Sequence, residues 1–156
     1  MADDNGHDHE PDGTGHDPVE DAKPGPEPDG EHERAGAEWL VNRYWERIWL
    51  DRDLDALEDL VADPVVRHMA EGTETLTRRE LRRRLAAAFE AVRGCEVSIH
   101  DQIAEGPTVW TRLTLRGVSL ATAKPMSVAW MAQYRVEDGR IAEIWSLHQP
   151  GADWSA

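Results

Sequence analysis

The stretch that decides the fold is MSVAWMAQYRVEDGRIAEIW, residues 126–145. Apolar and polar side chains alternate along residues 126–136, and the alternation resumes in residues 140–145. A period of two is typical of a β-strand that buries one face. Asp138-Gly139 separates the two runs, and Asp-Gly favours a type I′ turn because both central residues of that turn need positive φ. The stretch therefore predicts a β-hairpin that turns at residues 138–139.

Further strands are expected upstream of this hairpin. Residues 95–103 and 109–116 also alternate with a period of two, and Gly106-Pro107 between them predicts a turn. Residues 64–68 are expected to form a short strand earlier in the chain. The second half of the chain thus predicts a long antiparallel meander of four strands.

The first half of the chain has the period of helices instead. A helix is expected over residues 36–50, and Asp53 can cap a second, short helix. A third helix is expected over residues 78–93, with a capping box that starts at Thr77 and a C-terminal cap at Gly94. Three helices followed by a meander predict an α+β fold, with the helices on one face of a strongly curved sheet. The face of the first helix that should be buried consists of Val41, Tyr44, Trp45 and Ile48.

Charge and composition divide the chain into a tail and a domain. Residues 1–34 contain twelve Asp and Glu against two basic residues, so they carry a net −10 of the total −14. The only large apolar side chains of this segment are Met1 and Val19, so it cannot bury enough surface to order itself. We expect a disordered tail over residues 1–34, a domain over residues 35–150 and a C-terminal tail over residues 151–156. Four tail histidines lie among carboxylates and could hold a divalent metal loosely, but a solvated tail is the preferred interpretation: His7, His9, His16 and His32.

The acidic balance also argues against several classes of partner and site. It would repel a phosphate backbone, so nucleic acid is not expected as a partner, and the arginines of residues 78–84 are interpreted as a solvated helix face. Cys95 is the only cysteine, and no base lies near it in sequence, so we interpret it as a small apolar residue. The N-terminus lacks the pattern of a signal peptide, and no apolar run approaches the length of a membrane span. We expect a cytoplasmic protein without a metal or cofactor.

Six short segments follow one another in a distinctive order and spacing: Leu40-Val41-Asn42-Arg43-Tyr44, Asp53-Leu54-Asp55-Ala56-Leu57, Val65-Val66-Arg67-His68, Asp101-Gln102-Ile103-Ala104-Glu105-Gly106, Leu113-Thr114-Leu115-Arg116-Gly117 and Asp138-Gly139-Arg140-Ile141-Ala142-Glu143-Ile144-Trp145. Together they resemble the SnoaL-like polyketide cyclase family of the nuclear transport factor 2-like superfamily, over residues 37–150. The resemblance implies a cone-shaped sheet that three N-terminal helices close, with a ligand cavity inside. It also implies dimerisation through the outer face of the sheet.

The resemblance further implies where relatives transfer protons. The acid/base pair of the cyclases corresponds here to Ala132 and Ser146. In the isomerases the acidic donor also corresponds to Ala132, and the base lies near His68. In the epoxide hydrolases Arg112 is kept, but the two acids correspond to Thr114 and Ser146. Alanine and serine cannot transfer a proton at neutral pH, so none of these mechanisms can be copied to this chain.

The same alignment places a set of polar and aromatic side chains on the cavity side. Tyr44 is either a core tyrosine or a donor to an oxyanion. His68 is either an acid/base group or a strand-end histidine bonded to backbone. Arg112 needs an anionic partner, which is either an internal carboxylate such as Asp101 or an acidic ligand. These three are the catalytic candidates, and the ligand-binding candidates are Trp45, Trp110, Thr114, Trp130, Ala132, Ser146 and His148.

Three functions remain open at this point. The first is an acid/base enzyme for a small, apolar carbonyl compound, in a cyclase, isomerase or hydratase role, in which His68 takes a proton and Arg112 or Tyr44 holds the oxyanion. The second is a non-catalytic protein that binds such a ligand. The third is an interaction protein that docks through its acidic tail. A homodimer is expected in addition, because three side chains of the outer sheet face are too apolar to remain wet: Leu113, Met131 and Trp145.

Overall fold

The protein is described here by a computed structural model that covers residues 30–155, with side chains from residue 36 onward. Most of the tail that the sequence predicts lies outside the described residues, including His7, His9 and His16, and so does the side chain of His32. Within the described part of the chain, no helix combines the length and the apolar character that crossing a membrane requires.

The helices occupy the first half of the domain, as expected. Helix α1 (Gly30–Tyr44) begins earlier than the sequence predicts and continues directly as a π-helical segment, η1 (Trp45–Leu50). A 3₁₀ turn, η2 (Leu54–Ala56), leads into the short helix α2 (Leu57–Leu60). The third α-helix is α3 (Arg78–Ala91). The predicted apolar face of the first helix is buried, because Val41, Tyr44, Trp45 and Ile48 are all at most 5% exposed.

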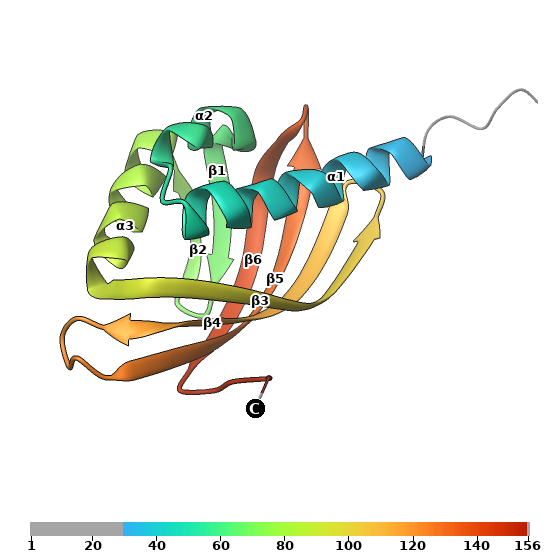
Figure 1. The fold of residues 1–156 in the computed structure, drawn as a ribbon. Helices are drawn as coiled ribbons and strands as arrows, with labels where there is room; N and C mark the ends of the chain where they lie inside the picture. The colour runs from blue at the N-terminus through green and yellow to red at the C-terminus, as the bar shows by residue number, and fades with distance from the viewer. Residues whose placement is uncertain (1–29, 156) are drawn as a thin grey trace, which may run out of the picture.

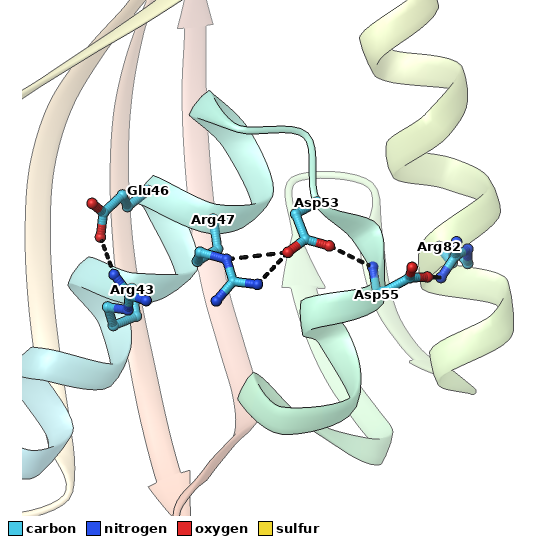
Figure 2. Close-up of polar contacts among 6 residues, drawn as sticks. All are labelled: Arg43, Glu46, Arg47, Asp53, Asp55 and Arg82. Atoms are coloured by element: carbon cyan, nitrogen blue, oxygen red, sulfur yellow. Dashed lines mark hydrogen bonds and ion pairs between the residues drawn. The ribbon is translucent and has the colours of Figure 1, made fainter.

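A chain of polar contacts connects the helical segments (Figure 2). Asp53 accepts a hydrogen bond from the backbone N–H of Asp55 at 3.2 Å, which confirms the predicted cap of the second helical segment. The other carboxylate oxygen of Asp53 accepts from the guanidinium of Arg47, with Nε at 3.1 Å. The Asp55 side chain in turn pairs with Arg82 of α3 at 2.6 Å. The contacts of Asp53 and Asp55 therefore link η1, η2 and α3 around the turn after residue 50.

Helix α3 starts as the sequence predicts but ends earlier. Thr77 and Glu80 form the complete capping box, in which each side chain bonds the backbone N–H of the other. The helix ends at Ala91, and Gly94 is not its cap. Gly94 instead lies in the following strand with φ +63°, where the register of the strand shifts. A β-bulge at Gly94, like a helix C-cap, needs a residue with positive φ, and this explains why a glycine stands here.

In the part of the chain that the structure describes, six strands form one sheet in the order β2-β1-β6-β5-β4-β3. The predicted hairpin is confirmed, since Asp138 and Gly139 have φ +48° and +71° and join β5 to β6. The strand β2 was not predicted, and β1 pairs with β6 in parallel, so the sheet is not entirely antiparallel. The bounds are β1 (Val61–Met69), β2 (Gly72–Leu76), β3 (Val92–Glu105), β4 (Thr108–Ser119), β5 (Pro125–Glu137) and β6 (Arg140–Pro150).

The two faces of the curved sheet have different surroundings (Figure 1). We call the face that α1 and α3 cover the inner face and the opposite one the outer face. Leu113 of β4, Tyr134 of β5 and Ile144 of β6 lie on the inner face and join Val41 of α1 and Leu81 of α3 in one core. Because side chains alternate between faces, the residues next to these three in sequence lie on the outer face. Each strand therefore presents one set of side chains to the helices and another to the opposite side.

Candidate ligand-binding site

A small cavity lies between the helices and the inner face, where the resemblance places a ligand. It has a volume of about 20 Å³, which is room for about one water molecule. Ligand pockets are usually about 300–1,000 Å³, so the protein's own side chains fill most of the space inside the cone. The lining residues come from α1, η1, β1, α3, β5 and β6: Tyr44, Trp45, Trp49, Arg67, Leu81, Leu85, Trp130, Tyr134, Ile144 and Ser146.

Three tryptophans occupy the interior. Trp45 and Trp49 stack at 5.4 Å with their planes 30° apart. Both come from η1, where the wider π-helical turn presents the two rings to the same side. Trp130 of β5 packs edge-on against each of them, at 5.6 Å from Trp45 and 5.4 Å from Trp49. The Nε1 atoms of all three indoles are buried and have no hydrogen-bond acceptor among the described residues.

Two buried tyrosines, Tyr44 and Tyr134, also line the cavity. Burial raises the pKa of Tyr44, and it raises the pKa of Tyr134 well above its usual value. The hydroxyls of Tyr44 and Tyr134 lie close to the indoles of Trp49 and Trp45, respectively, although neither N–H has the geometry of a hydrogen bond. Both phenols are therefore neutral at physiological pH and can donate a hydrogen bond.

Arg67 is the one charged side chain among the described lining residues. It faces inward from β1, where its register partner on β6 is Ile144. Its nearest carboxylate is Glu74, at 3.7 Å from Nη1, and Glu74 makes a closer ion pair of 2.6 Å with Arg84. Among the described side chains, the charge of Arg67 is therefore only partly balanced. This arginine was not among the predicted site residues.

His68, the residue next to Arg67, lies on the outer face. Its Nε2 is 2.6 Å from Oε1 of Glu143, and since an ionised carboxylate only accepts, Nε2 donates this hydrogen bond. Its Nδ1 is 2.8 Å from Oγ1 of Thr73, and its ring stacks on Trp145 at 4.6 Å. The hydrogen bond from His68, together with the guanidinium of Arg135, lowers the pKa of Glu143. The prediction that His68 faces the cavity is therefore wrong, because β1 turns Arg67 inward.

Three further candidates also lie on the outer face. The guanidinium of Arg112 is 5.7 Å from the ring centre of Trp154. Thr114 Oγ1 accepts a hydrogen bond from the backbone N–H of Trp154 and lies 2.8 Å from Nε2 of His100. Trp110 is 50% exposed. The expected placement of all three on the cavity side is wrong, since β4 directs its odd-numbered residues inward.

The remaining candidates lie on the cavity side of the sheet. Tyr44, Trp45, Trp130 and Ser146 line the cavity as predicted. Ala132 is buried opposite Ser146, and His148 pairs with Trp130 across the strands, with ring centres 5.4 Å apart. His148 is exposed, so it lies at the edge of the aromatic cluster and not inside it. The lining residues that sequence reasoning missed are Trp49, Arg67 and Tyr134.

The C-terminal segment covers part of the outer face instead of extending from it as a tail. Asp153 forms two hydrogen bonds of 2.7 Å with Arg116, which lower the pKa of Asp153. Beside the covered area is a groove of about 480 Å³, whose lining includes Ile103, Trp110 and Met131. Met131 is 49% exposed on the outer face. Leu113 is fully buried on the inner face, so the prediction that Leu113 contributes to an outer contact is wrong.

The arginines of α3 and the single cysteine have the surroundings that the sequence predicts. Arg82 and Arg84 of α3 pair with Asp55 and Glu74, which agrees with a solvated, ion-paired helix face. Burial raises the pKa of the Cys95 thiol, so the thiolate that nucleophilic chemistry needs is disfavoured.

The curved sheet with its covering helices is the fold of the nuclear transport factor 2-like superfamily. A model of the SnoaL-like domain matches residues 41–144, and the chain belongs to this family. No curated protein sequence matches the chain.

Solved structures with the same fold are distant in sequence. A SnoaL-like polyketide cyclase from Agrobacterium tumefaciens is 13% identical, with a TM-score of 0.64, and the match covers 72% of this chain and 91% of that one. An LEH-like epoxide hydrolase of M. tuberculosis is 21% identical, with a TM-score of 0.63, and the match covers 75% of this chain and 85% of that one. TsrD from Streptomyces laurentii is 18% identical, with a TM-score of 0.65 and coverage of 74% and 90%. At these identities the similarity supports the fold and not a shared reaction.

Proposed function

We propose that the protein binds a small, largely apolar molecule with a hydrogen-bond-accepting oxygen in the inner cavity. The observation that carries this proposal is the set of three buried indole N–H groups that have no hydrogen-bond acceptor within the described part of the chain. Each buried donor without a partner costs about 1–3 kcal/mol, and an oxygen inside the aromatic cluster would remove that cost. The apolar rings around these donors suit the carbon skeleton of such a ligand.

Entry of a ligand requires a side chain to move, because the cavity holds about one water molecule. Trp130 is the best candidate for this movement. It is only half-buried, its indole N–H has no hydrogen-bond partner among residues 36–155, and its cross-strand neighbour His148 is exposed. Rotation of Trp130 away from Trp45 and Trp49 would join the cavity to solvent beside β6.

The composition of the lining favours binding over acid/base catalysis. The described lining residues include neither a carboxylate nor an imidazole, so no group in the cavity is suited to take a proton from carbon at neutral pH. The enzyme hypothesis needs its proton acceptor and its oxyanion donor on the substrate's side of the sheet, and His68 and Arg112 both lie on the other side.

Titration calorimetry with matched probes tests the binding proposal. Acetophenone carries a carbonyl oxygen on an aromatic ring, and ethylbenzene has a similar shape without the oxygen. Acetophenone should bind with heat release and ethylbenzene should bind at least about tenfold more weakly, because only the ketone satisfies the indoles. Trp130→Ala should admit acetophenone more readily than Trp130→Phe. Equal binding of the two probes, or binding of neither, would contradict the proposal.

A proton-transfer reaction is the second candidate, and His148 is the observation that favours it. Its imidazole packs on Trp130 at the edge of the cavity, and the names of two relatives denote enzymes. If His148 acts as the base, the protein should catalyse exchange of deuterium into the methyl group of acetophenone, and His148→Gln should abolish that exchange. Proton NMR in D₂O measures the rate, with His100→Gln on the outer face as control. No exchange above the buffer rate would exclude this reaction for the probe.

We also propose that two copies pair through the outer face. Four apolar side chains on this face are between 49% and 64% exposed, which is more than a solvated sheet face usually carries: Ile103, Trp110, Met131 and Leu147. Met131→Glu should give a monomer in sedimentation experiments, whereas Leu120→Glu, in the exposed β4–β5 connection, should leave the dimer intact. A monomeric wild-type protein at micromolar concentration would contradict this proposal.

A further inference from the structure

The electrostatics of the inner cavity restrict the kind of oxygen that would bind there. Arg67 brings a positive charge to the lining, and its nearest carboxylate is 3.7 Å away and shared with Arg84. The positive charge of Arg67 also acts on both phenols of the cavity, against the effect of burial on their pKa. An arginine that is only 18% exposed and incompletely paired is a ready partner for an anion.

The neutral polar groups of the lining also favour an anion, because they donate hydrogen bonds. The indoles of Trp45, Trp49 and Trp130 can donate and cannot accept. The phenols of Tyr44 and Tyr134 keep their protons, since burial raises both pKa values. A neutral carbonyl has two lone pairs for these donors, whereas a carboxylate has about four and strengthens each hydrogen bond by its charge.

Building on the proposed function, we propose that the ligand of the inner cavity is an organic anion, with a flat apolar skeleton that carries a carboxylate or a comparable oxyanion. The anionic group lies against Arg67 and the two phenols, and the skeleton lies among the three tryptophans. Charge pairing with Arg67 offsets the cost of removing the anion from water. A cationic ligand is disfavoured, because the same guanidinium repels it even though aromatic rings attract cations.

The test compares two probes that differ in charge at pH 7. Benzoate and acetophenone are close in size, and titration calorimetry gives the affinity of each for the whole chain. Benzoate should bind at least about tenfold more tightly than acetophenone, since hydrogen bonds to charged groups are stronger. Raising the salt concentration should weaken benzoate binding and leave acetophenone binding unchanged.

Variants of Arg67 identify the group responsible. Arg67→Met keeps an unbranched apolar stem and removes the charged guanidinium, so it should lower benzoate affinity at least about tenfold and leave acetophenone affinity within about twofold. Arg67→Lys keeps the charge and should retain part of the preference for benzoate, although a lysine cannot match the planar geometry of a guanidinium. Arg79→Met, at an exposed position of α3 away from the cavity lining, is the control. Thermal unfolding confirms that each variant is folded.

The outcomes separate this inference from the proposed function. If acetophenone binds and benzoate binds no better, the cavity takes a neutral ligand, and the inference is wrong while the proposed function stands. If Arg67→Met and Arg79→Met reduce benzoate affinity equally, the preference arises from overall charge and not from Arg67, which also overturns the inference. If neither probe binds, the proposed function itself fails.

Discussion

The inner and outer faces of the sheet carry opposite kinds of polar chemistry. On the outer face, Glu143 accepts hydrogen bonds from both His68, at 2.6 Å, and Arg135, at 2.8 Å. On the inner face, Arg67 lies 3.7 Å from Glu74, which pairs more closely with Arg84, and the indole N–H groups of the cavity make no hydrogen bond to any described residue. The imidazole of His68 and the carboxylate of Glu143, which are groups often associated with proton transfer, are thus paired with each other on the outer face. The groups that remain available for a ligand are hydrogen-bond donors on the inside.

The largest effect that separates the two faces should come from packing. Leu113 on the inner face is fully buried, so Leu113→Ala should lower the free energy of unfolding by about 2–5 kcal/mol. Met131, its outer-face counterpart at 49% exposure, should lose less than about 1 kcal/mol on substitution by alanine. Urea unfolding measures both, at concentrations where sedimentation shows a monomer. Equal losses would contradict the assignment of the two faces.

A smaller effect should distinguish the paired charges of the outer face by their pH dependence. The pKa of Glu143 lies below its ordinary value of 4.5, mainly because His68 donates a hydrogen bond to the carboxylate and to a smaller extent because Arg135 pairs with it. The carboxylate therefore stabilises the fold above its ordinary pKa, and this contribution is lost as the pH falls through the lower pKa of the folded state.

Glu143→Gln should accordingly reduce the free energy of unfolding by about 1 kcal/mol at pH 7, and the difference from wild type should disappear at strongly acidic pH. Urea unfolding across this pH range gives the difference directly. A difference that does not change with pH would mean that Glu143 acts through its shape and not its charge.

The smallest effect is expected where the C-terminal segment lies on the outer face. Asp153→Asn removes the charge that pairs with Arg116, and the pair is partly open to solvent, so little change in global stability is expected. Hydrogen exchange is more sensitive here, because the amide of Trp154 bonds Thr114 only while the segment is in place. Faster exchange of that amide in Asp153→Asn supports the contact, and unchanged exchange argues against it.

The parts of the fold that local chemistry determines could be predicted from the sequence. The turn at Asp138-Gly139, the capping box at Thr77 and the cap at Asp53 each depend on a few neighbouring residues, and all three are confirmed. The π-helical turn of η1 and the position of the C-terminal segment could not be predicted, because both depend on contacts with distant parts of the chain.

The candidate site was predicted well on two strands and wrongly on two others. Trp130 and Ser146 lie on the inner face, as the alignment with the family implies. On β4 the alignment with the family placed Arg112 on the inner face. The buried apolar residues of that strand, however, follow a period of two that includes Leu113 and not Arg112. A shift of one residue moves every side chain of a strand to the other face, so the hydrophobic alternation was the better guide there. The same shift of one residue on β1 explains why His68 was predicted to face the cavity, whereas Arg67 does so.

The most direct test of the inner-face account is an NMR spectrum of the indole N–H groups during titration with benzoate. The chain has seven tryptophans, of which three surround the cavity and two, Trp110 and Trp145, lie on the outer face. If benzoate binds in the cavity, the signals of Trp45, Trp49 and Trp130 should shift together as their donors gain an acceptor, while those of Trp110 and Trp145 stay in place. Shifts confined to Trp110 or Trp145, with the three cavity signals unchanged, would contradict it.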